Sequence, residues 1–332
     1  MKKHSTPRFA RPVRAGRPST GSAATLAPRK EDSTDMQNAP NANRSHTPHP
    51  KATPGTPVLV FVVPAYKESP HLDACLWSLR QQTVPCRILI TTSTPNDHID
   101  LVAKKHGVPV FANPKGGSIA ADWNFALEKA GTGLVTLAHQ DDLYNEHYAE
   151  ACLAVLRRNP DMVMAFTDYA EVLGEGGVIR GNTAMLIIKR MLLFPFLFRS
   201  AIRSRFIRKA VLRLGSPVCC PSVCLNRAVV PDFRFQSEYT VNMDWDAWLR
   251  LADVRGATVH IRERYCLHRI HGGSETSSGI RDNRRAEEDL RIFRRLWPKP
   301  IADLLAKVYA LSYQSNNTAE GASRNAAEKQ GA

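Results

Sequence analysis

Apolar runs and helically spaced apolar positions alternate along residues 58–167. The first is a continuous apolar run at 58–63, which suits a strand that is buried on both faces of a parallel sheet. A Ser-Pro pair then marks a helix start, and Leu72, Leu76 and Leu79 share one face of that helix. The pattern continues with strands predicted at 87–92, 108–112, 134–138 and 162–167 and helices predicted at 99–105, 118–130 and 146–158. This alternation predicts an α/β fold with a mostly parallel sheet flanked by helices.

The pattern changes on both sides of this segment. Residues 1–56 contain few large apolar residues and many Pro, Ser, Thr and Asn residues, so we expect a disordered basic leader. Helical periodicity returns at 244–252 and again at 283–296. The expected organisation is a single main domain at 57–275, C-terminal helices at 276–314 and a disordered tail at 315–332.

The net charge of +14 is concentrated in two segments. Residues 1–56 hold ten Lys and Arg against three Asp and Glu, and residues 180–231 hold ten Lys and Arg and no acid. Because a nucleic-acid binder more often spreads basic residues along its folded binding face, no nucleic-acid partner is expected. The seven cysteines are odd in number and include no CxxC pair, which indicates reduced, core-packed thiols in a cytoplasmic setting.

An acidic pair gives the first sign of chemistry. Asp141 and Asp142 follow the strand predicted at 134–138, and ligands of α/β sheets bind beyond the carboxyl ends of the strands. Adjacent carboxylates there offer the oxygen ligands that Mg²⁺ and Mn²⁺ take, often together with substrate phosphates. Asp244, roughly a hundred residues later at the head of a predicted helix, is a candidate proton acceptor. Each of these carboxylates has a structural alternative as a helix cap.

Short motifs in a fixed order resemble the family-2 glycosyltransferases, which are inverting enzymes with the GT-A fold. They are Val62-Val63-Pro64-Ala65-Tyr66-Lys67-Glu68, Gln82-Thr83, Asp122-Trp123-Asn124, His139-Gln140-Asp141-Asp142, Met243-Asp244-Trp245 and Arg269-Ile270-His271. The resemblance covers residues 57–275. It implies a GT-A catalytic domain, Rossmann-like with a mostly parallel mixed sheet, and a helical C-terminal extension.

The resemblance also implies roles for individual residues. Asp141 would bind the divalent cation, Mn²⁺ or Mg²⁺, that bridges the donor diphosphate, and Asp244 would deprotonate the acceptor hydroxyl. The candidate metal ligands beside Asp141 are His139 and His271, and the candidate donor-binding residues are Pro64, Tyr66, Glu68, Ser93, Lys115, Asn124 and Asp142. The implied reaction moves a sugar from a UDP- or dTDP-linked donor to a hydroxyl of a glycan or lipid-linked acceptor by in-line displacement.

Three positions depart from the family pattern. His139 stands where the family has the first Asp of its metal motif, which leaves the metal and its necessity open. Residues 91–97 offer hydroxyl and amide groups in place of an acidic run, so the preference for uridine is open too. Met243 replaces the Glu that usually precedes the base.

The basic segment 180–231 suggests a partner surface. Its apolar run at 191–198 is far shorter than the ~20 apolar residues of a bilayer span. Ile202, Phe206 and Ala210 are predicted to line one face of a helix surrounded by Arg199, Arg203, Arg205, Arg208, Lys209 and Arg213. Three readings stay open: an interfacial helix on an anionic membrane, a cover over the acceptor groove, and an ordinary solvated helix. The first would place the chain at the inner face of the cell membrane, in cell-envelope polysaccharide synthesis.

Two other classes of function compete with this hypothesis. A sugar-nucleotide nucleotidyltransferase should carry a Gly-rich phosphate loop after the first strand, and residues 64–70 contain no Gly. A non-enzymatic basic module would use residues 1–56 to bind nucleic acid or anionic lipid. A glycosyltransferase fold without activity is a further alternative, because His139 and Met243 depart from the pattern.

Overall fold

The computed structural model describes residues 58–173, 178–271 and 283–310, all within one compact unit, Arg44–Ala332. The predicted leader and the predicted tail lie outside the described residues. The strands are β1 (Leu59–Ala65), β2 (Cys86–Thr92), β3 (Val110–Ala112), β4 (Leu134–Leu137), β5 (Leu143–Tyr144), β6 (Met162–Leu173), β7 (Val178–Arg180), β8 (Ala201–Ile202), β9 (Val223–Asn226) and β10 (Ala257–Ile270). The helices are α1 (Leu72–Arg80), α2 (Asp97–His106), α3 (Ile119–Ala130), α4 (Tyr148–Arg158), α5 (Ala184–Leu192), α6 (Pro195–Phe198), α7 (Arg205–Leu212), the 3₁₀ turn η2 (Cys220–Ser222), α8 (Met243–Leu251) and α10 (Arg284–Leu296). A last helix runs from residue 299 to residue 310, where the description ends.

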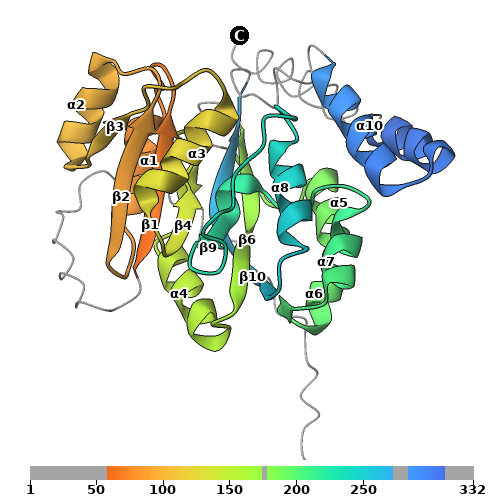
Figure 1. The fold of residues 1–332 in the computed structure, drawn as a ribbon. Coiled ribbons are helices and arrows are strands. Elements are labelled where there is room, and N and C mark those ends of the chain that lie inside the picture. The colour runs from red at the N-terminus through yellow and green to blue at the C-terminus, as the bar shows by residue number, and fades with distance from the viewer. Residues whose placement is uncertain (1–57, 174–177, 272–282, 311–332) are drawn as a thin grey trace, which may run out of the picture. The chain divides into compact units, whose positions relative to one another are not determined.

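These strands form one mixed sheet in the order β3-β2-β1-β4-β9-β6-β10-β5, with β7 beside β6 and β8 beside β10 (Figure 1). Neighbours among β1 to β4 pair in parallel, β9 lies antiparallel between β4 and β6, and β10 is parallel to β6. Six strands (β1 to β4, β6 and β10) therefore run in one direction. Their carboxyl ends lie along one edge of the sheet, which is where ligands of such folds bind.

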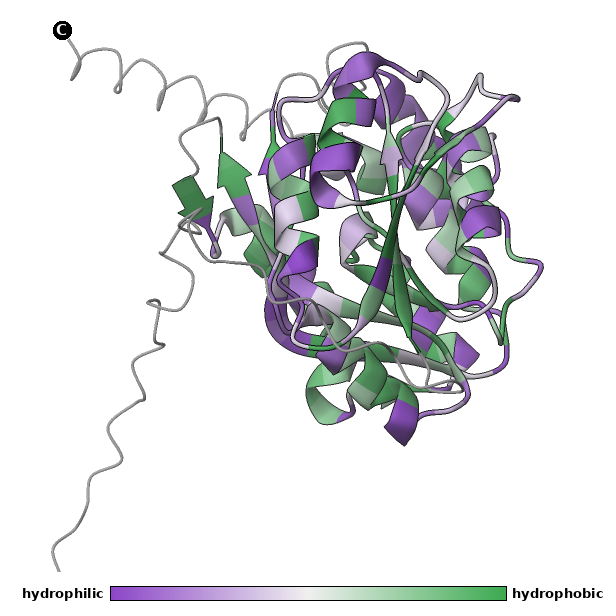
Figure 2. Ribbon diagram, turned by 90° about the vertical axis from the view of Figure 1, so that its left-hand side faces the viewer, coloured by the Kyte–Doolittle hydropathy of each residue, from purple (hydrophilic) through white to green (hydrophobic). Residues whose placement is uncertain are grey.

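Helices cover both faces of the sheet, which explains why the central strands β1 and β4 are largely apolar and buried. One hydrophobic cluster joins α1, α2 and α4 to the first face, and the other joins α3, α6, α7, α8 and α10 to the second. Figure 2 shows the hydrophobic colour gathered on the strands and on parts of the helices beside them. The predicted GT-A architecture, an α/β sheet between helices with a helical C-terminal region, is confirmed in these respects.

Most predicted elements are found within two residues of their expected bounds. The helix predicted at 118–130 is α3, and Ser118 caps it by accepting a hydrogen bond from the Ala121 N–H at 3.1 Å. The strand predicted at 162–167 is longer than expected, since β6 continues to Leu173. The long strand β10 was not predicted at all, although it carries the late Arg-x-His motif at its carboxyl end.

The predicted helical face of Ile202, Phe206 and Ala210 is wrong. Ile202 lies in β8 opposite Thr258, and α7 begins only at Arg205, because Ser204 caps it by accepting from the Ile207 N–H. The face of α7 that packs inward consists of Arg208, Val211 and Leu212, whereas Phe206 is 77% exposed.

Residues 180–231 are integrated into the fold. They supply β8 and β9 to the sheet and α6 and α7 to its second face, whereas Leu186 of α5 packs in the first hydrophobic cluster. Arg208, which was expected on the solvated basic surface, is 3% exposed and donates to the carbonyl oxygens of Leu251 and Val254. Among the described helices, none has the length and apolar content needed to cross a membrane. All seven cysteines fall in the described ranges, and each is a free thiol.

Candidate active site

The acidic turn follows β4 at the carboxyl edge of the sheet. Ala138 still donates to the Val62 carbonyl oxygen at 2.9 Å, and the turn closes with the Asp142 N–H on the His139 carbonyl oxygen at 3.2 Å. Between them, the Gln140 side chain exchanges two hydrogen bonds with the backbone of Tyr66, at 3.0 and 3.2 Å. The turn is therefore fixed to the loop that follows β1, in which Tyr66 and Glu68 lie.

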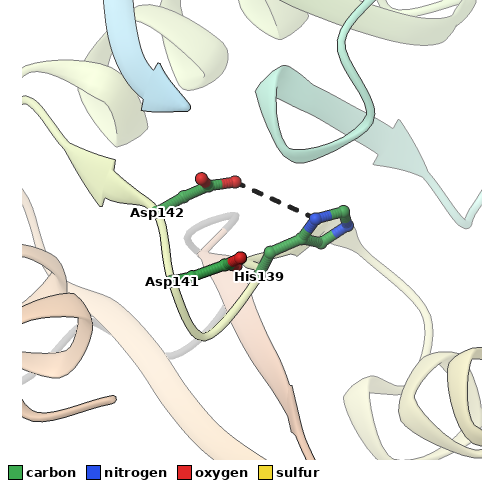
Figure 3. A group of neighbouring side chains, drawn as sticks. All are labelled: His139, Asp141 and Asp142. Carbon is green, nitrogen blue, oxygen red and sulfur yellow. Dashed lines mark ion pairs between the residues drawn. The ribbon is translucent and has the colours of Figure 1, made fainter. Parts of the chain in front are cut away.

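The turn gathers three groups that can bind a metal (Figure 3). One ligand atom from each of His139, Asp141 and Asp142 lies within 4.8 Å of the others. His139 Nδ1 is 3.9 Å from Asp142 Oδ2, and His139 Nε2 is buried without a hydrogen-bond partner in the described part of the chain. A divalent cation fits this donor set. The imidazole makes Mn²⁺ a better match than Mg²⁺, which prefers oxygen ligands.

The end of β10 holds Asp142 from the other side. Asp142 is 0% exposed, accepts a hydrogen bond from the Arg269 N–H at 2.8 Å, and lies 3.1 Å from His268 Nδ1. Burial opposes the charge of His268, but Asp142 and then Asp141 raise the pKa of its imidazole above the ordinary value. Asp142 therefore joins the turn to β10, which leaves Asp141 as the more accessible carboxylate.

Asp141 is paired with the late motif. His271 Nε2 lies 2.8 Å from Asp141 Oδ2, and Arg269 Nε donates to the Asp141 carbonyl oxygen at 3.0 Å. Burial works against ionisation of Asp141, yet the contact with His271 and the nearby rings of His139 and His268 lower its pKa to about 2. The Asp141 carboxylate is thus kept ionised over the whole physiological range.

Asp244 lies in the first turn of α8 and experiences the opposite shift. Its Oδ1 accepts from the Trp245 N–H at 2.7 Å. Burial raises its pKa above the ordinary value, and four groups partly offset the effect: Arg285, the Trp245 N–H, Lys189 and His139. His139 therefore belongs to the group that could hold a metal and also lies close enough to Asp244 to lower the pKa of that carboxyl.

The pKa values of two buried thiols, Cys219 and Cys220, are affected by both Asp142 and Asp244. Burial raises the pKa of Cys219 and of Cys220, and the charges of Asp142 and Asp244 raise both pKa values further. The acidic turn and the head of α8 come from distant parts of the sequence, yet the carboxylates of both act on the same two thiols.

Most of the expected donor-binding residues lie at or after the carboxyl ends of the neighbouring strands β1, β2 and β3. Pro64 is near the end of β1, and Tyr66, Glu68 and Lys115 are exposed on the loops that follow β1 and β3. Ser93, just after β2, donates to Asp122 at 2.7 Å, and Asn113 donates to the same carboxylate at 2.8 Å. Asp122, which sequence analysis quoted only as part of a motif, thereby ties the ends of β2 and β3 to α3.

The Asn124 side chain is hydrogen-bonded to the backbone of Phe235, and its contact with the donor stays a prediction. Its amide donates to the Phe235 carbonyl oxygen at 2.9 Å and accepts from the Phe235 N–H at 2.8 Å. These bonds hold Phe235 beside Trp123, with 4.9 Å between the two ring centroids. The Trp123 ring in turn lies beside the His139 ring, with 5.2 Å between their centroids. The side chain thus supports the wall behind His139, and both ends of its amide are engaged.

Two cations near Asp244, Lys189 and Arg285, were not predicted from the sequence. Lys189 of α5 donates to the Tyr169 hydroxyl at 2.7 Å, and burial lowers its pKa. Arg285 is the largest of the influences that lower the pKa of Asp244. The basic character of 180–231 hinted at Lys189, but no motif or spacing signalled Arg285.

Comparison with known proteins places the chain in a family. The profile described as "Glycosyl transferase family 2" matches residues 60–231, more than half of the chain. The chain belongs to this family. It is a glycosyltransferase, in agreement with the sequence expectation and against a nucleotidyltransferase or a purely binding module. The match ends before Asp244 and the late motif, so those residues are assigned from the structure and the sequence pattern.

Solved structures share the fold at low sequence identity. TarS from S. aureus (residues 1–349), also solved with UDP-GlcNAc, has 15% identity and a TM-score of 0.51 over 75% of this chain and 69–70% of that one. The mannosyltransferase PcManGT from Pyrobaculum calidifontis, solved with GDP-Man and Mn²⁺, has 16% identity and a TM-score of 0.50 over 76% of this chain and 70% of its own. No curated protein sequence matches the chain.

Proposed function

We propose that the chain moves a sugar from a nucleotide-sugar donor to an acceptor hydroxyl with inversion at the anomeric carbon. Asp244 is the general base in this proposal, and Asp141 with His139 binds a divalent cation. The observation that carries it is the position of His139, which lies within 4.8 Å of the acidic turn's carboxylates and also acts on Asp244. One donor can therefore meet both groups at once.

The chemical step follows from this placement. Asp244 takes the proton of the acceptor hydroxyl while the acceptor oxygen attacks the anomeric carbon from the face opposite the diphosphate. The bond from that carbon to the diphosphate oxygen breaks, and the nucleoside diphosphate leaves with the electron pair. General-base assistance of this kind contributes ~10²–10⁴-fold, and burial brings the pKa of Asp244 closer to the operating pH.

Asp141 and His139 are the proposed metal ligands, with Asp142 and His271 beside them. A bound divalent cation neutralises charge on the departing diphosphate. The low pKa of Asp141 keeps an anionic ligand available at every physiological pH, and the unpartnered Nε2 of His139 offers a second ligand atom. His271 Nε2, 2.8 Å from Asp141 Oδ2, is a further candidate ligand.

We assign the nucleotide to the loops after β1, β2 and β3. Exposed Tyr66 and Glu68, together with Pro64 and Ser93, border the base and ribose, and exposed Lys115 approaches the diphosphate. A UDP- or dTDP-linked sugar remains the proposed donor. Because structures with this fold were solved with UDP-GlcNAc and with GDP-Man, a donor screen includes GDP-linked sugars as well.

The exposed apolar surface of α5 to α7 suggests what kind of acceptor the protein uses. The helices α5, α6 and α7 expose apolar side chains that have no cover within the described chain: Met191 62%, Phe194 57%, Leu197 58%, Phe198 74% and Phe206 77%. No acidic residue occurs in 180–231, and Arg199 and Arg205 are exposed beside these aromatic rings. Exposed aromatic and basic side chains that are close together in the sequence suit an anionic lipid surface. The proposed acceptor is accordingly a glycan or lipid-linked hydroxyl at the cytoplasmic face of a membrane, in cell-envelope polysaccharide synthesis.

The deciding experiment is a donor screen. Purified full-length protein is incubated with UDP-, dTDP- and GDP-linked sugars and simple glycoside acceptors, with Mn²⁺, with Mg²⁺ or with a chelator, and nucleoside diphosphate release and glycoside product are measured. We expect turnover that needs a divalent cation, works better with Mn²⁺ than with Mg²⁺, and yields product of inverted anomeric configuration. A product of retained configuration would contradict the proposed role of Asp244.

A further inference from the structure

Helix α10 holds the backbone that leads into α8. The Glu288 carboxylate, 7% exposed, accepts hydrogen bonds from three consecutive backbone N–H groups: Thr240 at 2.8 Å, Val241 at 2.9 Å and Asn242 at 2.8 Å. Thr240 bonds to one oxygen, and Val241 and Asn242 share the other. A single buried side chain therefore fixes the path of three residues immediately before the helix that carries Asp244.

Two neighbouring contacts fasten the same helix start to α10. Asp289, 1% exposed, accepts from Asn242 Nδ2 at 2.7 Å. Asp246, also 1% exposed, pairs with Arg250 of its own helix and with Arg295 of α10, each at 2.7 Å. The first turn of α8 is thus bonded to α10 on both sides of Asp244.

The helix α8 needs this external support for a local reason. Asn242 occupies its N-cap position, but the Asn242 side chain makes no capping bond to the N–H groups of the first turn, since its amide points to Asp289. The carboxylates of α10 take over the task of fixing the helix start. Their negative charge near the amino end of α8 also complements the helix dipole.

We propose that Glu288 is a positioning residue for the catalytic base: its three backbone bonds hold the head of α8 so that Asp244 stays at the reacting edge of the sheet. This inference rests on the proposed function of Asp244. Glu288 lies beyond residues 60–231, so a helix outside the family match completes the active site. Arg285, one turn earlier on α10, adds the positive charge that most strongly offsets the effect of burial on Asp244.

The test compares Glu288→Gln with the matched control Glu287→Gln, which changes the exposed neighbour on the same helix. Glutamine fills the same volume, but its NH₂ group faces backbone N–H donors where a carboxylate oxygen stood. With a donor and acceptor pair from the screen, we expect Glu288→Gln to lower kcat by about tenfold or more through misplacement of Asp244. The donor KM should change by less than about twofold, and Glu287→Gln should match the wild type within about twofold.

A double-mutant cycle separates positioning from general stability. On the Asp244→Asn background, Glu288→Gln should cost less than about twofold in residual kcat, because the base that it positions is already gone. An equal loss on both backgrounds would show a merely structural role and overturn the proposal. Should Glu288→Gln fail to fold, Glu288→Asp keeps the charge with a shorter reach and should give an intermediate kcat; wild-type kcat in that variant also overturns it.

A readout that needs no substrate completes the test. The Asp244 carboxyl is titrated by ¹³C NMR in the full-length protein and assigned by its loss in Asp244→Asn. Glu288→Gln should shift the pKa of Asp244 back toward the ordinary Asp value of about 3.9, whereas Glu287→Gln should leave it unchanged. An unchanged pKa together with an unchanged kcat refutes the positioning role alone. Full activity in Asp244→Asn refutes the proposed base and the inference with it.

Discussion

The acidic turn after β4 and the head of α8 both present carboxylates to one region, but they are built in different ways. The turn is held by the sheet itself, through Gln140 to the loop after β1 and through Asp142 to the end of β10. The head of α8 is held by another helix, through Glu288 and Asp289. The acidic turn and the loop after β1 lie within the family match, although the end of β10 that also holds the turn lies beyond it. The head of α8 and its supports on α10 both lie beyond the match, and they depend on contacts that no single motif encodes.

The two regions also set opposite proton affinities. His271, His139 and His268 surround Asp141 and bring its pKa to about 2 despite burial. Asp244 is raised by burial, and its cationic neighbours only partly offset this effect. When the environments of two carboxylates push their pKa values apart, one carboxylate stays ionised and the other can exchange a proton. In the proposed function, Asp141 stays ionised as the metal ligand and Asp244 takes up the proton.

The largest effect is expected from removing the base. Asp244→Asn keeps the shape of the side chain and should lower kcat by about 10²–10⁴-fold, as measured by glycoside product under saturating donor. Donor binding, measured by calorimetry with the same nucleotide sugar and Mn²⁺, should stay within about threefold of the wild type, because only a group that acts on the acceptor is changed. Loss of donor binding would instead place Asp244 among the donor contacts.

Asp244→Asn, which should lower kcat, should not lower the stability of the fold. A carboxyl whose folded pKa is raised contributes stability below its unfolded pKa, and that contribution is lost as pH rises through the folded pKa. Asp244→Asn should therefore melt at or above the wild-type Tm at neutral pH. Asp246→Asn is the contrasting control, since it breaks the buried pairing with Arg250 and Arg295 and should lower the free energy of unfolding by roughly 2 kcal/mol.

Changes to His139 probe the other region. His139→Ala should weaken Mn²⁺ binding by about 10-fold or more, measured by electron paramagnetic resonance of free Mn²⁺. His139→Asp supplies the carboxylate that the family pattern has at this position and should raise the ratio of Mg²⁺- to Mn²⁺-supported activity. If both variants keep the metal preference of the wild type, His139 is not a ligand.

The pH dependence of kcat/KM should reflect Asp244. Because its pKa is raised above the ordinary value, activity should begin to fall on acidification at a higher pH than about 3.9, where an ordinary Asp titrates. The ionised carboxylate is the active form, so the loss appears on the acid side. Residual turnover of Asp244→Asn, followed over the same pH range, should lack this acid limb; a limb of unchanged position in that variant would assign it to another group.

The smallest effect concerns the exposed apolar surface of α5 to α7. Phe198→Ser with Phe206→Ser should reduce flotation with vesicles of anionic lipid by a few-fold and leave turnover on a soluble acceptor unchanged. Arg199→Glu with Arg205→Glu should give a salt-dependent loss. Arg208 is unsuited to this test, because it is buried against α8, and Arg203 and Lys209 are paired with Asp161 and Asp253. Equal flotation of all variants would remove the membrane contact.

Much of the fold was predicted from hydrophobic periodicity, because apolar strand segments alternate with helically spaced ones from β1 to β4, and because α2 and α3 have side-chain caps. The strand β10 was not predicted, although Val259 and Ile261 alternate with Thr258 and His260 in its first part. Its later residues include several charged ones, and β-bulges interrupt its register with β6. The orientation of α7 was not predicted, because the inward position of Arg208 depends on its hydrogen bonds to the carbonyl oxygens of Leu251 and Val254, some forty residues away in the sequence. Local periodicity does not show which buried polar side chains find hydrogen-bond partners far away in the sequence.

The candidate site shows the same division. The residues 139–142, Asp244 and His271 were found from local motifs, and the structure brings them into one neighbourhood. The supporting groups were not found, because Asp122, His268 and Glu288 act through partners far away in the chain. Asn124 was assigned to the donor from its motif, whereas the structure uses both ends of its amide to hold Phe235.

The central claim is that Asp141 and Asp244 serve one donor, and paramagnetic NMR tests it directly. Full-length protein with ¹³C-labelled aspartate carboxyls is titrated with Mn²⁺ and a nucleoside diphosphate that the screen identifies. The account predicts strong broadening of the Asp244 resonance, none at Asp161 beside the amino end of β6 at the opposite edge of the sheet, and loss of the effect in Asp141→Ala. Saturable Mn²⁺ binding that requires Asp141 but leaves the Asp244 resonance sharp would contradict it.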